Sequence, residues 1–473
     1  MPDLKINSMD GRETVLAEAV LNDFKSVLLG SLLQAEDQGY EAARTLWNGM
    51  IDLRPSLIAR CTGAADVISC VKFARKHNLL ISVKGAGHNI AGKASANGSF
   101  MIDLSLMNGV SVDPDAKTAT VGPGATLRML DHETQAFGLA TPVGINSTTG
   151  ISGLTLGGGF GWLSRSLGLT VDNLLSADIV TADGKLLHAS DKENPDIFWA
   201  IRGGGGNFGI VTSFKFRLHP IGPMLLAGLI VHPFSEADKV FRYYRDFVAK
   251  APDQLTCWVV LRKAPPLPFL PADVHGKEIF IIAVVYAGDM QEGEKLLEPL
   301  RKFGEPIADV VGPTPFTGFQ QAFDPLLTPG ARNYWKSHNF AELTDEAIDT
   351  ITGYVGELPS PLSEIFIGNL GGAVNRVPVN ATAYPHRDPN FVMNVHTRWE
   401  DKGSDKECID WARKLFEATA RFATGGVYVN FISEGEDLVP SAFGANYQRL
   451  AEIKKKYDPD NFFRINQNIK PAQ

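Results

Sequence analysis

Residues 81–92 read ISVKGAGHNIAG, and the interpretation of the chain starts from this stretch. It begins as an apolar run typical of a buried strand and continues as a loop in which glycines surround one histidine, His88. Because glycine has no Cβ, the backbone N–H groups of such a loop can approach an anionic group closely. The pattern therefore predicts a strand followed by an anion-binding turn. A structural glycine turn with a buried histidine would have the same sequence, so the rest of the chain must distinguish the two.

The residues around this stretch alternate between helical and strand patterns. Apolar residues recur at helical spacing over 64–77, and residues 79–83 have the length and composition of a short buried strand. Short strands are also expected at 100–104 and 118–121, and a helix at 127–137. This alternation predicts an α/β organisation for the first part of the chain.

Two further glycine clusters follow. Residues 150–161 read GISGLTLGGGFG, and residues 202–211 read RGGGGNFGIV. The second cluster contains the spacing GxGxxG of dinucleotide-binding proteins. That fingerprint should open a helix directly after a strand, whereas residues 210–218 continue as a strand, so a nicotinamide site is not favoured. So many glycines do favour backbone packed closely against a flat or phosphorylated group.

The pattern changes at about residue 222, where longer apolar strands and amphipathic helices begin. Strands are expected at 225–234, 279–286 and 391–399, and helices at 292–303 and 406–423. We expect a separate sheet covered by helices. A last helix is expected at 445–456, ending before Pro459 because proline cannot continue the hydrogen-bond ladder. The lysines at 454–456 are expected to form a solvated helix face.

Composition excludes several classes of protein. The chain has 473 residues, 44% of them hydrophobic, which is enough for two or three lobes. Its formal net charge of −8 gives no overall positive field, so neither nucleic acid nor a membrane is a predicted partner. The start lacks a secretory pattern, which favours a cytoplasmic location. The four cysteines form no cluster with histidine, so no metal site is predicted.

Taken together, the motifs resemble those of the berberine-bridge-enzyme-like group of FAD-linked oxidases, in the vanillyl-alcohol oxidase and p-cresol methylhydroxylase superfamily. The resemblance spans residues 47–471 and follows the order of that group. It rests on VKGAGHNIAG, MIDLS, VGPGATL, GISGLTLGGGFGWLSR, GLTVDNL, DIFWAIRGGGGNFGIVT and NYQRLAEIKKKYDPDNFFRINQNI.

The resemblance implies an α+β fold with two kinds of domain. A bipartite FAD-binding domain of two α/β subdomains would begin with residues 1–221, and residues 436–473 would return to it at the end of the chain. Residues 222–435 would form a substrate-binding domain, with an antiparallel sheet covered by helices.

The resemblance also assigns the cofactor site. His88 would carry FAD covalently, the loop before it would cradle the pyrophosphate, and residues 209–211 would lie along the isoalloxazine. The full set of implied cofactor-binding residues is His88, Lys84, Gly85, Ala86, Gly87, Asn89, Gly92, Asn146, Thr149, Gly150, Gly153, Gly157, Gly158, Gly209, Ile210, Val211, Asn466 and Asn468.

Two positions depart from the pattern of the group. Many members attach FAD a second time through a cysteine that aligns with Asn146, and asparagine cannot form a thioether. We therefore predict a single attachment, through His88. Thr149 aligns with a position that is usually aliphatic in relatives and is associated with oxygen access, which leaves oxidase and dehydrogenase both open.

Residues 428–431, YVNF, resemble the strand of the group that faces the flavin from the substrate domain. Tyr428 is the candidate catalytic base, with Asn430 as its orienting neighbour. A phenolate is a competent base only when its pKa falls well below about 10. Lys336 could supply the cation that lowers it, although a solvated lysine fits the sequence equally well. A tyrosine that only packs on a sheet is the alternative for Tyr428.

The resemblance implies an FAD-dependent oxidase. It would transfer a hydride from an alcohol, hemiacetal or amine carbon of a small organic substrate to flavin N5, with O2 as acceptor and H2O2 as product. The alternatives are an FAD-dependent dehydrogenase with another acceptor and a non-catalytic flavin-binding protein.

Overall fold

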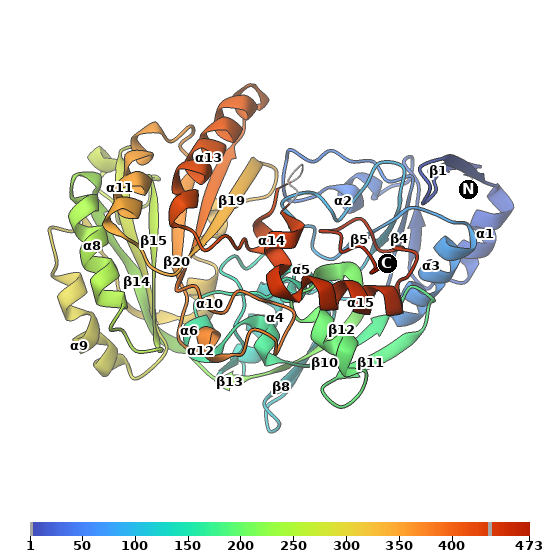
Figure 1. Ribbon diagram of the computed structural model, residues 1–473, viewed down its shortest axis with the longest axis horizontal. Coiled ribbons are helices and arrows are strands. Elements are labelled where there is room, and N and C mark those ends of the chain that lie inside the picture. The colour runs from blue at the N-terminus through green and yellow to red at the C-terminus, as the bar shows by residue number, and fades with distance from the viewer. Residues whose placement is uncertain (1–2, 434–437) are drawn as a thin grey trace.

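The computed structural model describes residues 3–433 and 438–473, which form two lobes side by side (Figure 1). One lobe contains both the start and the end of the chain, and the other is built around one large sheet. The predicted α+β architecture is therefore confirmed. The predicted domain boundary at residue 435 lies outside the described residues. In the described part of the chain, no helix has the length and apolar character needed to span a bilayer.

The first sheet carries the glycine loop from which the sequence interpretation started. Its strands are ordered β3 (Ser31–Leu33), β4 (Leu57–Arg60), β6 (Phe100–Asp103) and β5 (Ile81–Lys84), with β4 and β5 parallel to β6. Helix α3 (Ala64–Lys76) contributes Val67, Val71 and Ala74 to the core beside this sheet. The strand before the loop starts two residues later than predicted. The loop of residues 85–92 leaves the end of β5, as expected.

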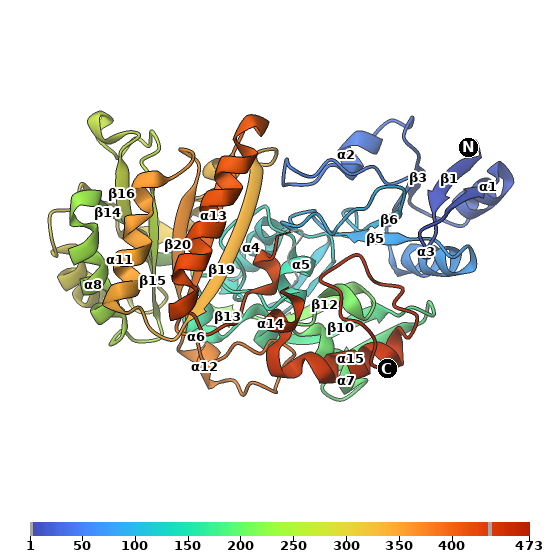
Figure 2. The ribbon, with the colours of Figure 1, turned by 45° about the horizontal axis from the view of Figure 1, so that its top comes forward.

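The second sheet is antiparallel and holds the third glycine cluster. Its order is β11 (Leu186–Ser190), β10 (Leu174–Val180), β12 (Ile210–Arg217), β8 (Thr118–Val121) and β7 (Val110–Asp113). Residues 210–217 form a strand after the glycines rather than a helix, as predicted. Helix α7 (Pro195–Ile201) and the late helix α15 (Tyr447–Tyr457) pack against each other, so the end of the chain returns to this lobe (Figures 1 and 2).

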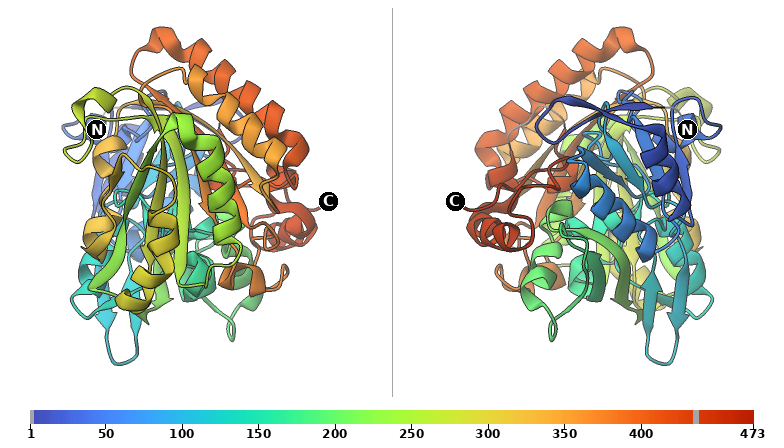
Figure 3. Two further views of the ribbon diagram at one scale, coloured as in Figure 1. Left: turned by 90° about the vertical axis from the view of Figure 1, so that its left-hand side faces the viewer. Right: turned by 90° about the vertical axis from the view of Figure 1, so that its right-hand side faces the viewer.

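The large sheet dominates the other lobe. Its strands are ordered β17 (Ala308–Asp309), β14 (Met224–Pro233), β16 (Glu278–Tyr286), β15 (Leu255–Lys263), β20 (Glu364–Asn369), β21 (Phe391–Trp399) and β19 (Arg332–Phe340), with β18 (Gly312–Pro315) also pairing with β14. All of these pairs are antiparallel. Helices α8 (Ala237–Val248), α9 (Met290–Arg301), α11 (Asp345–Gly353) and α13 (Asp405–Thr419) cover one face (Figure 3).

The short elements complete both lobes. They are β1 (Leu4–Asn7), β2 (Glu13–Leu16), β9 (Leu139–Ala140), β13 (His219–Pro220), α1 (Glu18–Ser26), α2 (Tyr40–Arg44), α4 (Leu127–Gln135), α5 (Ile151–Leu156), α6 (Ser164–Leu167), α10 (Phe316–Gln320), α12 (Ala373–Arg376) and α14 (Val439–Phe443).

The two faces of the large sheet have different roles. Side chains alternate between the faces of a strand, so Ile365 and Val395 lie in the core beneath the helices. Phe366, the next residue after Ile365, and Trp258 of β15 pack on the other face, toward the first lobe. Because both faces are covered, polar residues such as Asn394 are buried on the second face as well. This second face forms one wall of the cavity described below.

Two sequence expectations are corrected here. The segment expected to be a strand at Tyr428 forms a 3-10 turn over Val429–Phe431, because the N–H of Phe431 bonds to the carbonyl of Tyr428 three residues back instead of to a strand. The lysines at 454–456 are not all solvated. Lys454 is fully buried, and its Nζ donates to Asp458 Oδ2 at 2.6 Å, Asn207 O at 2.6 Å and Phe463 O at 2.9 Å.

Candidate functional site

A cavity of about 320 Å³ lies between the two lobes. The loop at His88, the glycine clusters, the 428–431 turn and the C-terminal residues 463–467 all line it. The large sheet supplies side chains from β15, β19, β20 and β21. The three glycine-rich stretches that the sequence analysis singled out therefore meet at one place.

The first-lobe wall of the cavity contains several glycines. A Cβ added at Gly153 or Gly206 would meet no other atom within 4 Å, and both glycines line the cavity. Gly87 has a φ of +79°, which L side chains rarely adopt. Asn466 lines the same wall, and its buried Oδ1 has no hydrogen-bond partner among the described residues. The space beside Gly153 and Gly206, together with an acceptor on Asn466 that has no partner among the described residues, fits FAD.

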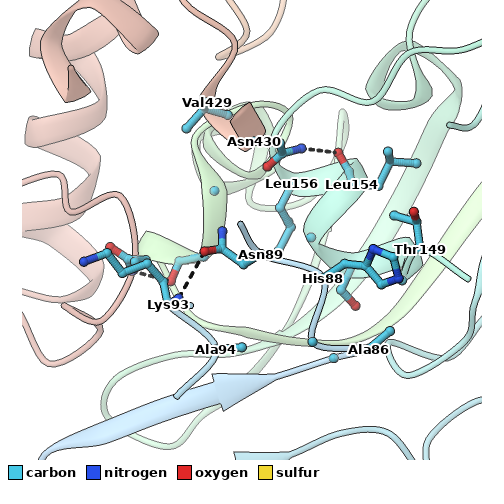
Figure 4. A pocket seen from close by; sticks show the side chains of 18 of the residues that line it. Ala86, His88, Asn89, Lys93, Ala94, Thr149, Leu154, Leu156, Val429 and Asn430 are labelled. Carbon is cyan, nitrogen blue, oxygen red and sulfur yellow. Dashed lines mark hydrogen bonds between the residues drawn. The ribbon is translucent and has the colours of Figure 1, made fainter. Parts of the chain in front are cut away.

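Most of the residues implied for cofactor binding line this cavity, and five of them do not. Those that line it are Gly85, Ala86, Gly87, His88, Asn89, Asn146, Thr149, Gly150, Gly153, Gly209, Ile210, Val211 and Asn466. Figure 4 shows His88, Asn89 and Thr149 together with Asn430 around it.

Four of the five residues that do not line the cavity make close contacts with neighbouring segments instead. Lys84 is buried, and its Nζ donates to Ala43 O at 2.5 Å. A Cβ on Gly92 would come within 2.7 Å of Ile51, and one on Gly158 within 2.8 Å of the Tyr384 ring. Gly157 packs in the same way against the side chain of Asn430, and Asn468 is the fifth of these residues.

His88 is held from two sides. Its Nε2 lies 3.0 Å from Thr148 Oγ1, and its ring stacks on Trp47 with centroids 4.9 Å apart. Burial lowers the pKa of His88 to about 4, although the negative charge of Asp324 opposes the shift. The imidazole is therefore neutral at physiological pH.

The segment that carries Asn146 and Thr148 is fixed to the loop of Asp324. That carboxylate accepts from the backbone N–H of Ser147 at 3.0 Å and from its hydroxyl at 2.5 Å. Arg128 pairs with the same carboxylate at 3.2 Å. The segment that contacts His88 is thus anchored by ionic and backbone contacts.

Tyr428 meets the first lobe through its hydroxyl oxygen. That oxygen accepts from the N–H of Gly159 at 3.1 Å and from Asn430 Nδ2 at 3.0 Å. Asn430 is oriented by a second, longer bond from Nδ2 to Leu154 O at 3.4 Å, which is drawn in Figure 4. Burial raises the pKa of Tyr428 to about 12, even though both hydrogen bonds lower it.

Lys336 does not reach this phenol. Trp335 lines the cavity, so the next residue along β19 points to the opposite face of the sheet. There the buried Lys336 places its Nζ 4.3 Å from the ring centroid of Phe416, next to α13. Both sequence interpretations of Lys336, as a solvated side chain and as the cation near Tyr428, are therefore wrong.

The sequence analysis missed the sheet wall of the cavity. This wall consists of Trp258, Trp335, Glu364, Phe366, Asn394 and His396. The signal was present in β21, where Asn394, His396 and Arg398 place a polar side chain at every second position of the strand. This alternation shows that one face differs from the other, but it does not show what that face meets.

The polar residues on this wall differ in their hydrogen bonding: Glu364 and His396 have partners, whereas Asn394 has none among the described residues. Glu364 accepts from Arg262 Nη1 at 2.6 Å and lies 3.2 Å from His396 Nδ1. Burial raises the pKa of Glu364, but the charge of Arg262 and the bond with His396 outweigh it and lower the pKa to about 2. Asn394 is buried next to this cluster, and neither its Oδ1 nor its Nδ2 has a partner among the described residues.

Comparison with known proteins supports these features. Residues 55–190 match the family described as FAD binding domain, and residues 427–470 match the family described as berberine and berberine like. An uncharacterized FAD-linked oxidoreductase from Bacillus subtilis (strain 168) is 32% identical over 460 residues, which is 95% of this chain and 98% of the relative.

Two further similarities concern an oxidase. The (R)-6-hydroxynicotine oxidase of Paenarthrobacter nicotinovorans is 30% identical over 463 residues, covering 93% of this chain and 97% of that protein. The crystal structure of 6-hydroxy-D-nicotine oxidase from Arthrobacter nicotinovorans superposes with a TM-score of 0.84 at 29% identity, covering 94% of this chain and 98% of that one.

Proposed function

The chain belongs to the FAD-linked oxidoreductases whose C-terminal segment is berberine-like, and on that premise we propose that it is an FAD-dependent oxidase. It removes a hydride from an alcohol, hemiacetal or amine carbon of a small organic substrate, and O2 becomes H2O2. The observation that carries the proposal is the single cavity, which joins the glycine-lined wall of one lobe to Tyr428 and the sheet wall of the other.

The residues of the first lobe hold the cofactor. Backbone N–H groups of the 85–89 loop would hold its pyrophosphate, and residues 209–211 would hold its ring system, since both stretches line the cavity. His88 is the one covalent anchor, because Asn146 occupies the position of the second. When bound, FAD supplies the acceptor for two electrons that the reaction requires.

Tyr428 and Asn430 act on the substrate. Tyr428 already accepts two hydrogen bonds, so its own proton is directed to a ligand, and the same two donors stabilise the oxygen once that proton is lost. With a pKa of about 12, Tyr428 is a neutral phenol over most of the working range. It therefore orients a substrate hydroxyl or amine at low pH and accepts its proton more readily as the pH rises.

The domain division is part of this proposal. Residues 1–221 and 436–473 form the FAD-binding domain, and residues 222–435 form the substrate-binding domain. The placement of β14 and β16 in the sheet that walls the cavity, and of α15 beside α7, supports this division.

The test is a substrate panel of alcohols, sugars and cyclic amines, monitored by the visible flavin band without oxygen. A substrate bleaches this band, and air then restores it within seconds. A flavin that a substrate bleaches but that stays reduced in air for minutes identifies a dehydrogenase instead. A yellow protein that no member of the panel bleaches favours a flavin-binding role without turnover.

A further inference from the structure

Three residues next to the cavity form a continuous hydrogen-bonded chain. His88 Nε2 lies 3.0 Å from Thr148 Oγ1, and Thr148 Oγ1 lies 2.7 Å from Asn146 Oδ1. The backbone N–H of Thr148 also reaches Asn146 Oδ1, at 3.0 Å. His88 and Asn146 line the cavity, so the chain runs along its wall.

The direction of each hydrogen bond in this chain can be deduced. A backbone N–H can only donate, so the Asn146 atom that it meets is the amide oxygen. An amide oxygen carries no hydrogen, and the Thr148 hydroxyl must therefore donate its one proton to it. The Thr148 oxygen is then an acceptor toward His88, which places a hydrogen on Nε2.

This order fixes the tautomer of the imidazole. A neutral imidazole has one N–H and one lone pair, so a hydrogen on Nε2 leaves the lone pair on Nδ1. No hydrogen bond joins Nδ1 to a described residue. The Trp47 ring, 21° from parallel with His88, further limits rotation of the imidazole. The nitrogen with the lone pair is thus the one that remains free.

We propose that Thr148 and Asn146 are positioning residues for flavin attachment, which hold His88 in the tautomer whose Nδ1 is the nucleophile. The inference rests on the proposed function, in which His88 is the attachment point. Asn146 then has a role of its own at the position where a second covalent link is absent: it fixes the orientation of the Thr148 hydroxyl.

The attachment step balances as follows. A bond forms between Nδ1 and the 8-methyl carbon of the flavin, one C–H bond of that methyl group breaks, and its proton leaves to solvent. Before attachment, the Nε2–H of the imidazole donates a hydrogen bond to Thr148 Oγ1. After the new bond has formed, the imidazole releases this Nε2 proton. The methyl carbon loses two electrons in total, and dioxygen takes them together with two protons to give H2O2.

The experiment measures covalent attachment rather than turnover. Protein produced under riboflavin starvation is incubated with FAD in air, and samples are precipitated with acid at intervals. The flavin that stays in the pellet and the intact mass report attachment, while yellow protein before precipitation reports folding and cofactor binding. We expect Thr148→Val and Asn146→Leu to slow attachment at least tenfold.

The matched controls keep the hydrogen bonds. Thr148→Ser retains the hydroxyl and Asn146→Asp retains the acceptor, so both should attach FAD at nearly the wild-type rate. A merely structural role would not change the nitrogen that reacts. We expect NMR of the flavinyl peptide to show Nδ1 alone in the wild type and a mixture of Nδ1 and Nε2 in Thr148→Val.

The outcomes separate the two proposals. If wild-type protein holds no acid-stable flavin, the proposed attachment through His88 is wrong. If wild-type protein holds acid-stable flavin and Thr148→Val acquires it at the same rate and on the same nitrogen, the positioning role is overturned. If Thr148→Val does not fold, the comparison of Asn146→Leu with Asn146→Asp decides in the same way.

Discussion

At the scale of single residues, Tyr428 shows two opposed influences on one group. Two donors on its oxygen favour the phenolate, whereas burial favours the neutral phenol and prevails, so that the pKa rises to about 12. The sequence analysis required the opposite shift for a strong base. The cation that it suggested lies on the other face of the sheet.

Replacing Tyr428 by Phe should slow flavin reduction about 10²- to 10⁴-fold, the typical contribution of a general base. The flavin should remain bound, because phenylalanine keeps the ring contact with Phe160, whose centroid lies 4.8 Å from that of Tyr428, and loses only the hydroxyl that bonds to Gly159 and Asn430. Rapid-mixing measurement of flavin bleaching without oxygen checks this. Tyr384→Phe is the matched control, since Tyr384 is also buried but does not line the cavity. Equal rates in wild type and Tyr428→Phe would remove Tyr428 from the mechanism.

The pH dependence of flavin reduction follows from the same pKa. A base acts in its deprotonated form, and a pKa raised to about 12 means that this form grows with pH throughout the accessible range. We expect the rate constant to rise with pH from 7 to 10 without reaching a plateau. The slope should disappear in Tyr428→Phe. A plateau that begins near pH 7 would show that another group accepts the proton.

At the scale of elements, strand β21 places polar side chains on a face that is otherwise packed. Asn394 pairs across the sheet with Phe366 on one side and Ser337 on the other. A buried amide without a partner costs about 1–3 kcal/mol for each unsatisfied group. Asn394 lines the cavity and does not stabilise the strand. Its presence there favours a role in binding the substrate.

Asn394→Leu should therefore leave the melting temperature unchanged or raise it. In the same variant, KM for a substrate should rise roughly tenfold to hundredfold, which corresponds to the loss of one hydrogen bond. Thermal unfolding and steady-state kinetics test the two parts separately. Asn369→Leu is the matched control, because Asn369 is buried in β20 and is not a cavity-lining residue, and its Oδ1 likewise has no partner in the part of the chain that the structure describes. A KM that rises equally in both variants would contradict a specific role for Asn394.

Helix α15 is tied to the glycine turn by one buried lysine. Lys454 donates to Asp458 in its own helix region, to Asn207 in the turn and to Phe463 in the C-terminal segment. Lys454→Met leaves the Asp458 carboxylate without its cation, and we expect a loss of about 3–5 kcal/mol in the free energy of unfolding. Urea unfolding measures it. The double variant with Asp458→Asn should recover part of the loss, and no recovery would contradict a charge effect.

At the scale of the whole molecule, the cavity lies between the lobes, so a bound cofactor joins them. A ligand that binds only the folded state stabilises it by about 2.7 kcal/mol at a concentration one hundred times its Kd. We expect His88→Ala to show a melting temperature that rises with added FAD, because that protein holds the cofactor reversibly. Wild-type protein with FAD already attached should not respond. Scanning calorimetry with increasing FAD makes this comparison.

The local part of this structure could be predicted from the sequence because glycine patterns and apolar periodicity report on the neighbouring backbone. Residues 391–399 and 118–121 form strands with the expected bounds, and residues 210–217 continue as a strand after the glycines. The loop at His88 and the FAD-linked family were also identified correctly, since a motif order that spans the whole chain is specific.

Only the tertiary structure decided what each side chain meets across the fold. The direction in which Lys336 points depends on the face of β19 that the helices cover, and the burial of Lys454 depends on a turn some 250 positions earlier in the chain. The wall formed by Glu364, Asn394 and His396 likewise arises from the register of separate strands. The sequence by itself determined the glycine framework and the FAD-linked family, because glycine patterns within each motif depend on the local backbone. The electrostatics of Tyr428 and the tautomer of His88 were decided by partners brought together only in the folded chain.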